Sequence, residues 1–267
     1  MLSDRAYLLG QQYRTDDNLN ARARLHWHYS TNSYGWFRWE FERLDIPAEA
    51  DVLELGCGTA TLWTDNVDRI PPGWRLILSD FSAGMLDAAQ RNLADVRRAI
   101  RYEVIDAQAI SLPDASVDAV IANHMLYHVP DRDRALADIR RVLRPGGRLF
   151  AGTNGAGHMR ELDELLIAVA PDEASVRDES RHTRAFGLET GGGQLAPWFR
   201  EVTCEDYEDG LAVTEVQPVV DYVLSMSVAS AFDDGRVADV RRRVEASIAQ
   251  RGAFHITKSI GLFRAIR

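Results

Sequence analysis

The sequence contains 267 residues, of which 46% are hydrophobic and 27% are charged, as in an ordinary globular protein that can bury a full core. Its 31 Lys and Arg residues stand against 40 Asp and Glu residues, so the net charge is −9 and nucleic acid is a disfavoured partner. Two cysteines form no disulfide framework and fit a cytoplasmic location. The polar N-terminus and the lack of an apolar run of roughly 20 residues argue against a signal peptide and a membrane span.

Aromatic residues are concentrated in the segment 1–47, ahead of the expected sheet. A helix over 36–44 is predicted from its apolar spacing, and Pro47 ends it. The rings ahead of this helix also suit a wall against a positively charged group, because ring faces attract cations. The aromatic residues of the run are Trp27, Tyr29, Tyr34, Trp36, Phe37, Trp39 and Phe41.

A predicted buried strand over 52–55 runs directly into a glycine turn. Gly56 and Gly58 remove β-carbons where a ligand must approach the backbone. Open α/β sheets bind nucleotides at the carboxyl ends of their parallel strands. The turn therefore predicts a nucleotide-like ligand at this strand end.

Asp80 ends the next predicted strand, over 75–80, at a spacing typical of nucleotide-binding α/β folds. Its carboxylate can accept hydrogen bonds from both hydroxyls of a ribose, and Phe81 is placed to lie against an adenine ring. A simpler interpretation, that Asp80 only caps the following helix, stays open, although Ser82 can supply that cap itself.

Two further strands are predicted over 100–104 and 119–122, each followed by residues that can contact a ligand. These residues are Asp106 and Ala107 after the first strand, and Asn123, His124, Tyr127 and His128 after the second. The next helix ends at Arg-Pro-Gly-Gly, residues 144–147, because proline breaks a helix and glycine closes it in the left-handed conformation. A fifth strand follows over 149–153.

These features together resemble the class I S-adenosylmethionine-dependent methyltransferases, of the small-molecule, ubiquinone-biosynthesis-like type. The glycine turn, Asp80, Asp106, the histidine segment and the Leu-Arg-Pro-Gly-Gly run occur in the family's order over about 100 residues. Ala60 replaces the third glycine of the family's turn. The resemblance implies an α/β fold: a Rossmann-like, seven-stranded, mostly parallel sheet with an antiparallel edge strand, an N-terminal helical lid and an inserted helical cap.

The resemblance also implies S-adenosyl-L-methionine as the cofactor. His28-Tyr29-Ser30 is similar to the His-Tyr-Asp entry of the cyclopropane and mycolic-acid methyltransferases, in which the tyrosine helps to hold the cofactor carboxylate. The cofactor-binding residues implied in this way are Glu54, Gly56, Cys57, Gly58, Asp80, Phe81, Met85, Asp106, Ala107, Asn123 and Tyr29. A dinucleotide dehydrogenase is disfavoured, because Thr61 stands where Gly-x-Gly-x-x-Gly needs its third glycine.

The remainder of the chain, 154–267, is expected to complete the sheet and to insert substrate-cap helices. We expect a single structural domain overall, with a lid at 1–47 and a cofactor-binding core at 48–153. The elements predicted beyond the core are helices over 162–169, 186–199, 219–228 and 237–248, and strands over 202–207 and 254–263.

Methyl transfer needs positioning of the reactants and, for some acceptors, the removal of one proton. His128, His124 and Tyr127 are the catalytic candidates, because they follow the fourth strand and imidazole titrates near neutral pH. If the acceptor is an alkene carbon, a carboxylate would take the proton instead. The carboxylate alternatives are Glu161, Glu164 and Glu173. No metal is expected, since no carboxylate stands between the two histidines as in His-Glu-x-x-His.

The residues after the fourth strand also narrow the acceptor. DNA-adenine and glutamine N-methyltransferases carry Asn/Asp-Pro-Pro-aromatic there, whereas this chain has Asn-His-Met-Leu at 123–126. We therefore expect a small, partly apolar acceptor from natural-product metabolism, methylated on O, N or C, and leave a homo-oligomer open. The alternative is a non-methylating S-adenosylmethionine-binding protein of the same fold, such as a cyclase or a scaffold.

Overall fold

A seven-stranded sheet forms the centre of the molecule, a computed structural model that describes residues 24–171, 185–226 and 232–267. The strand order is β3-β2-β1-β4-β5-β7-β6, and β7 runs antiparallel to both of its neighbours. The strands are β1 (Glu49–Leu55), β2 (Gly73–Asp80), β3 (Ile100–Val104), β4 (Val117–Ile121), β5 (Leu143–Asn154), β6 (Arg200–Val213) and β7 (Phe254–Ile266). The predicted fold class is confirmed, with β6 and β7 as the antiparallel pair at the edge.

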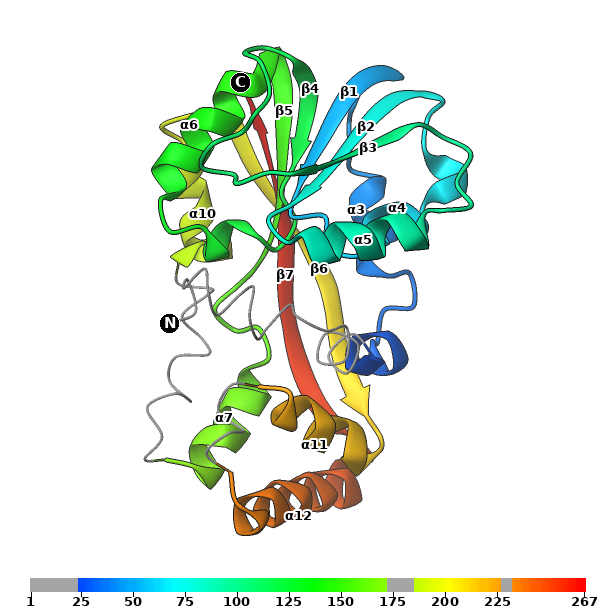
Figure 1. The fold of residues 1–267 in the computed structure, drawn as a ribbon. Helices are drawn as coiled ribbons and strands as arrows, with labels where there is room; N and C mark the ends of the chain where they lie inside the picture. Colours follow the sequence, from blue (N-terminus) through cyan, green and yellow to red (C-terminus); the bar gives the residue numbers. More distant parts are fainter. Residues whose placement is uncertain (1–23, 172–184, 227–231) are drawn as a thin grey trace.

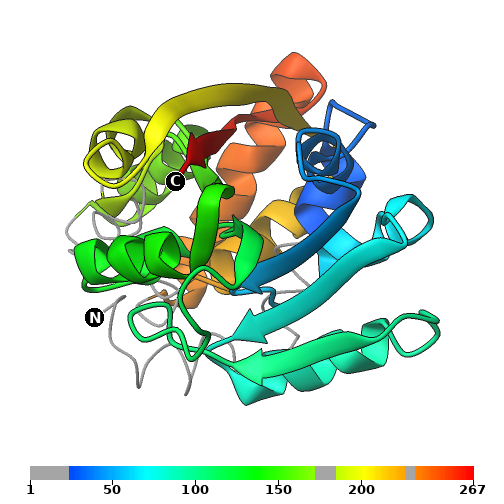
Figure 2. The same ribbon diagram turned by 90° about the horizontal axis from the view of Figure 1, so that it is seen from above.

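Helices cover both faces of this sheet (Figures 1 and 2). Neighbouring side chains of β1 alternate between the two faces, so Val52 lies in one buried cluster and Leu53 in the other. The helices that pack on the Val52 face are α3 (Trp36–Phe41), α4 (Thr61–Thr64) and α5 (Ala83–Asn92). Those on the Leu53 face are α6 (Arg132–Val142) and α10 (Leu188–Leu195). Short 3₁₀ turns occupy Val67–Arg69 and Leu126–His128.

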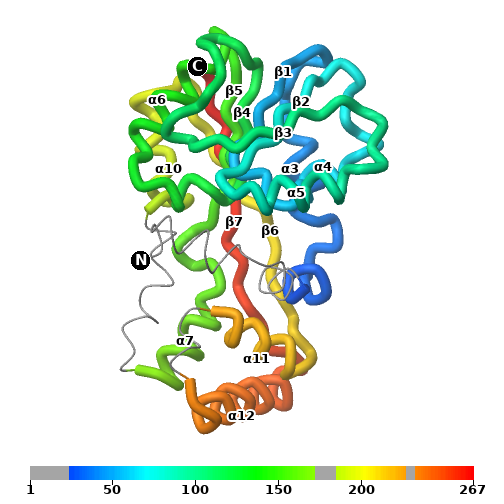
Figure 3. The backbone as a smooth tube through the Cα atoms, viewed as in Figure 1, coloured from blue at the N-terminus to red at the C-terminus, as the bar shows by residue number. Residues whose placement is uncertain are grey.

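Strand β6 is much longer than predicted, β7 begins as predicted and continues to Ile266, and the two together extend beyond the rest of the sheet (Figures 1 and 3). Pairing between β5 and β7 ends at Asn154 and Ile260, whereas pairing between β6 and β7 continues to Val213 and Phe254. This two-stranded ribbon carries α7 (Arg160–Val169), α11 (Val216–Leu224) and α12 (Asp234–Arg251). We call these three helices, with the outer ribbon, the cap.

The cap has a hydrophobic core of its own, separate from the two clusters on the sheet. Its buried residues include Leu162, Leu166, Val220, Val244 and Ile256, each at most 2% exposed. A helical segment at residues 24–29 adds Leu25 to this core, and Ser30 then pairs with Leu211 of β6. Because β6 is parallel to β1–β5, the carboxyl ends of all these strands point toward the cap (Figure 1).

The predicted helix over 36–44 exists but ends at Phe41. Of the aromatic run around it, Trp36 and Phe41 are core residues, whereas Trp27 is 64% exposed and Tyr34 is 41% exposed. The interpretation of the rings ahead of the helix as a wall against a ligand stays a prediction.

Arg141 of α6 and Arg144 of β5 are paired with acids. Arg141 contacts Asp138, and Arg144 bridges Asp118 and Asp51. These contacts identify both arginines as part of the structural surface. In the part of the chain that the structure describes, no helix is both long enough and apolar enough to cross a membrane.

Candidate functional site

The glycine turn joins β1 to α4 at the point where strand order diverges. Gly56 (φ 70°), Gly58 (φ 53°) and Ala60 (φ 65°) all adopt left-handed backbone conformations. A β-carbon at Gly56 would lie 2.9 Å from the β-carbon of Met125, so close packing explains this glycine. A β-carbon at Gly58 would meet no atom of the described residues within 4 Å. The described part of the chain thus leaves the space beside Gly58 unfilled, as expected where a ligand approaches the backbone.

Asp80 connects the end of β2 to this turn. Its Oδ2 accepts a hydrogen bond from the Gly58 amide at 3.0 Å, and its Oδ1 accepts one from the Ser82 amide at 2.8 Å. The Ser82 side chain makes no capping bond, so the expectation that Ser82 caps α5 is wrong. Burial raises the pKa of Asp80. Since each carboxylate oxygen has a second lone pair, Asp80 can still accept from two ribose hydroxyls.

Glu54 lies beneath the turn and is only 2% exposed. Its Oε2 accepts a hydrogen bond of 2.5 Å from the indole nitrogen of Trp63 in α4. Burial raises its pKa to about 8 despite this bond, and the negative charge of Asp80 acts in the same direction. One oxygen of Glu54 is therefore engaged in holding α4 against β1.

The predicted adenine side lies after β3. Asp106 Oδ1 accepts from both the backbone and the side-chain nitrogen of Gln108, at 2.9 and 3.1 Å. Ala107 is buried, as is Met85 in the first turn of α5, while Phe81 is half-buried at the end of β2. These residues follow the ends of adjacent strands, the arrangement that the sequence predicted.

Asn123 follows β4, and its buried amide meets the helix that precedes the sheet. A β-carbon at Gly152 would lie 2.5 Å from Asn123 Oδ1 and 3.0 Å from the Trp36 ring, so this glycine lets the two side chains converge. Glu40, one helical turn after Trp36, is fully buried near Asn123. Glu40 lies in the helix predicted over 36–44, and no role in a site was predicted for it.

Three histidines from distant parts of the chain gather between the strand ends and the cap. His124 follows β4 in a left-handed conformation (φ 49°), with its ring centroid 5.6 Å from that of Trp36. His158, in the loop after β5, stacks on His26 of the 24–29 helical segment at 6.3 Å. The ring of Tyr222 in α11 contacts His26 edge-on. We call His26, His124 and His158 the histidine cluster.

These imidazoles are neutral at pH 7. Burial, reinforced by the positive charge of Lys258, lowers the pKa of His26 to about 4 and that of His124 to about 4. Burial likewise holds the pKa of His158 well below its usual value. Because the Ser259 amide donates to His158 Nδ1 at 3.3 Å, the neutral ring of His158 carries its proton on Nε2.

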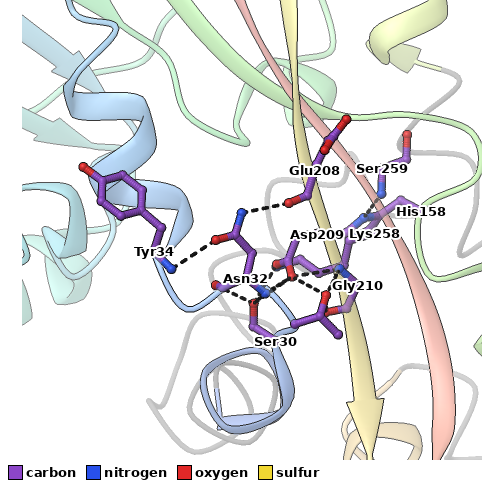
Figure 4. A network of polar contacts seen from close by, with 10 residues as sticks. Ser30, Asn32, Tyr34, His158, Glu208, Asp209, Gly210, Lys258 and Ser259 are labelled. Atoms are coloured by element: carbon purple, nitrogen blue, oxygen red, sulfur yellow. Dashed lines mark hydrogen bonds and ion pairs between the residues drawn. The ribbon is translucent and has the colours of Figure 1, made fainter.

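Lys258 owes its own placement to a buried ion pair with Asp209 across β6 and β7, shown in Figure 4. Their side chains are 6% and 1% exposed. Ser30 donates to both oxygens of Asp209 at 2.8 and 2.9 Å, and the Asn32 amide adds a bond at 3.1 Å. This ion pair was not predicted from the sequence.

The other predicted catalytic residues occupy different surroundings. His128 and Tyr127 lie in the 3₁₀ turn after β4 and pack against each other edge-on, with ring centroids 4.5 Å apart. Burial raises the pKa of Tyr29, and Glu215 at the start of α11 interacts with its hydroxyl, so Tyr29 belongs to the cap contacts.

The carboxylate alternatives fit a structural role better than a catalytic one. Glu161 accepts hydrogen bonds from the backbone and hydroxyl of Thr257, both at 2.7 Å. Although burial acts against it, this bonding holds the pKa of Glu161 below its usual value. Glu164 is exposed, and Glu173 lies outside the described residues. Across the ranges that the structure describes, no group of three or more His, Cys, Asp or Glu residues could hold a metal ion.

Comparison with known proteins agrees with this geometry. Residues 53–151 match a family described as "Methyltransferase domain". The chain is 34% identical over 117 residues to the ubiquinone/menaquinone biosynthesis C-methyltransferase UbiE of Hahella chejuensis, covering 43% of this chain and 47% of that protein. It is 30% identical over 161 residues to the 27-O-demethylrifamycin SV methyltransferase of Amycolatopsis mediterranei, covering 55% of this chain and 56% of that protein. The chain thus matches about half the length of these curated relatives.

A solved structure extends the likeness to the whole fold. Phosphoethanolamine N-methyltransferase 2 of Haemonchus contortus, solved with S-adenosyl-L-methionine, aligns with a TM-score of 0.62 at 18% identity, covering 98% of this chain and 59% of that one. The chain carries a class I S-adenosylmethionine-dependent methyltransferase domain. The predicted family is confirmed, and S-adenosylmethionine is the cofactor that it uses.

The residues of this methyltransferase domain fit that cofactor. Gly58 leaves unfilled space beside the backbone, and Asp80 keeps two lone pairs for hydroxyl groups. Asn123 presents a buried amide at the end of β4 whose atoms make no complete hydrogen bond with the described residues. The open space beside the backbone, the carboxylate and the amide together suit the sugar and amino-acid parts of S-adenosylmethionine.

Proposed function

We propose that this protein transfers the methyl group of S-adenosylmethionine to a small, partly apolar acceptor held between the strand ends and the cap. The observation that carries the proposal is the histidine cluster at the same sheet edge as the glycine turn. His124 follows β4, the strand next to β1, and its imidazole is neutral. With a pKa of about 4 this imidazole is a weak base at pH 7, but it can take the proton that an acceptor loses once methyl transfer has made that proton strongly acidic.

The bound cofactor supplies an electrophilic methyl group, so the chain's own work is positioning, exclusion of water and proton removal. We assign the sugar contact to Asp80, the adenine side to Asp106 and Phe81, and the backbone approach to Gly58. We assign removal of the acceptor's proton to His124, because this residue follows a central strand and its ring packs beside that of Trp36.

The cap side of the cluster is assigned to the acceptor. His26 and His158 can each hydrogen-bond to an acceptor while neutral, and the rings of Tyr222 and Trp36 supply apolar surface. The names of two relatives, a quinone-biosynthesis C-methyltransferase and a demethylrifamycin methyltransferase, support a small-molecule acceptor. We propose a natural-product acceptor on this basis, with O-, N- and C-methylation as the outcomes to be tested.

Transfer of labelled methyl groups tests the proposal. The protein is incubated with methyl-labelled S-adenosylmethionine and with phenols, quinols and amines of small, partly apolar scaffolds, and label in product is measured. We expect transfer to at least one class. His124→Gln should lower kcat at least tenfold while the affinity for S-adenosylhomocysteine stays within about twofold, since proton transfer typically contributes 10²–10⁴-fold.

His255→Gln is the matched control, because His255 is an exposed histidine on β7. It should leave kcat unchanged. Tight binding of S-adenosylhomocysteine without label transfer to any acceptor class would overturn the proposal in favour of a non-methylating protein. Equal kcat in the His124 variant and the wild type would remove the assignment of the base.

A further inference from the structure

Glu40 of α3 is a buried acid for which the protein supplies no partner of opposite charge. Its side chain is 0% exposed, and neither of its oxygens has a complete hydrogen bond to any residue that the structure describes. Its carboxyl group lies within interaction range of the Asn123 amide and of the Glu54 carboxyl. Burying a charged acid that lacks hydrogen bonds and a cation is costly, unless the acid is protonated or a ligand supplies the missing partners.

Other buried polar atoms near Glu40 also lack hydrogen-bond partners among the described residues. Both side-chain atoms of Asn123 and the indole nitrogen of Trp36 are buried and make no complete hydrogen bond with described residues. Gly152 brings Asn123 and Trp36 together, since a β-carbon there would clash with both side chains. The group therefore offers acceptors, the Glu40 carboxyl and Asn123 Oδ1, next to donors, Asn123 Nδ2 and Trp36 Nε1.

This combination matches one chemical group, a zwitterionic amino acid. An α-ammonium donates three hydrogen bonds, and its positive charge is attracted by the Glu40 and Glu54 carboxyl groups. An α-carboxylate accepts hydrogen bonds from an amide and an indole N–H. The group lies where β1 and β4 end, next to the glycine turn. S-adenosylmethionine carries such a group at the end of its methionyl chain.

We propose that Glu40 binds the α-ammonium of S-adenosylmethionine, and that Asn123 and Trp36 supply further hydrogen bonds to the amino-acid end of the cofactor. The proposal rests on the cofactor site proposed above and adds residues from the helix ahead of the sheet. It also explains why a glutamate occupies the buried face of α3, between Trp36 and Phe41, where an apolar residue would pack without cost.

The proposal has a consequence for protons. Burial, with the negative charge of Glu54 acting in the same direction, raises the pKa of Glu40 well above its usual value, so the ligand-free site favours the protonated carboxyl. An ammonium placed against it favours the carboxylate. Cofactor binding is therefore expected to lower the pKa of Glu40 and to be coupled to release of its proton.

Isothermal titration calorimetry with two ligands tests the assignment directly. S-adenosylhomocysteine carries the α-ammonium, and its desamino analogue has hydrogen in that position. The wild type should bind the first ligand at least tenfold more tightly than the second. In Glu40→Gln the preference should fall to within about threefold, because the neutral amide forms no ion pair with the ammonium.

Two further variants separate this role from a general effect. Glu42→Gln makes the same change at an acid of partly exposed side chain just beyond α3, and should keep the full preference. Trp36→Phe removes the indole N–H together with part of the ring and should weaken both ligands alike, so that the preference stays. Titration in two buffers of different ionisation enthalpy should show proton release in the wild type and a smaller release in Glu40→Gln.

The outcomes discriminate between failures. If Glu40→Gln keeps the wild-type preference and proton release, Glu40 is a structural acid and the proposal is overturned, while the proposed function stands. If the wild type binds neither ligand, the proposed cofactor site fails and this proposal fails with it. Should Glu40→Gln be too unstable to titrate, Glu40→Asp, which keeps the charge but shortens the side chain, must show a reduced preference, and an undiminished one refutes the assignment.

Discussion

Substitution of Gly58 by alanine separates the two reasons for a glycine in the turn. Gly58 has φ 53°, and a β-carbon there would have no atom of the described residues within 4 Å. The folded protein alone would therefore register only the backbone strain of a left-handed alanine, about 1–2 kcal/mol. Reduced freedom of the unfolded chain offsets roughly 0.4–1 kcal/mol of this. Ala60, in the same turn with φ 65°, shows that the chain accepts such a residue.

We therefore expect Gly58→Ala to lower the free energy of unfolding by about 1 kcal/mol, or the Tm by about 2–4 °C. Cofactor affinity should fall much further, because the β-carbon would occupy the space that the proposed ligand needs. We expect S-adenosylhomocysteine to bind at least tenfold more weakly, which corresponds to about 1.4 kcal/mol. Calorimetric titration and urea denaturation measure the two quantities on the same sample.

Gly146→Ala is the matched control. Gly146 has φ 79°, and a β-carbon there would also meet nothing within 4 Å, but it lies at the amino end of the parallel strands. Its loss of stability should equal that of Gly58→Ala, with wild-type affinity. Unchanged affinity in Gly58→Ala would show that the space beside the turn is not the ligand's, and would refute the placement of the cofactor.

Further predictions concern the buried charges. Lys258→Met should lower the free energy of unfolding by about 3–5 kcal/mol, because it leaves Asp209 buried without its cation. Adding Asp209→Asn to the same chain should recover part of that loss. A loss below about 1 kcal/mol in urea denaturation would contradict this account. The free energy of unfolding of the ligand-free protein should also fall as the pH drops from 6.5 toward about 4. In that window His26 and His124 bind protons in the unfolded chain, whereas their folded pKa values are about 4. Urea denaturation at several pH values measures this slope, which His124→Gln should reduce.

The core of the fold could be predicted because its signals are local. Strand β3 has the predicted bounds, Ile100–Val104, since five residues of a short strand are enclosed by a polar stretch and an aspartate. The glycine turn and Asp80 could be predicted as ligand contacts, because glycines or an acid directly after a buried strand are typical of a ligand site at the strand end. The three-part division at residues 47 and 153 stays a prediction.

The cap and the histidine cluster could not be predicted in the same way. β6 was expected over 202–207 but runs from Arg200 to Val213, because its later residues gain their pairing from β7, which follows only after α11 and α12. His26, His158 and Lys258 are far apart in the sequence, and only the folded chain brings them together. The sequence placed His128 ahead of His124 as the catalytic candidate, because local spacing carried no information about which of them the cap approaches.

The continuous ribbon of β6 and β7 explains how one fold can keep its cofactor and change its acceptor. Lys258 and Asp209 lie on the part of the ribbon beyond the pairing with β5, while the later residues of β7 pair inside the sheet. Backbone hydrogen bonds thus fix how far Lys258 and Asp209 lie from the end of β4. Substitutions on α7, α11 and α12 can reshape the acceptor side without disturbing this distance, because the cap core is separate from the clusters that support the glycine turn. Acceptor specificity should therefore follow the cap helices, and cofactor affinity should follow β1, β2, β4 and α3.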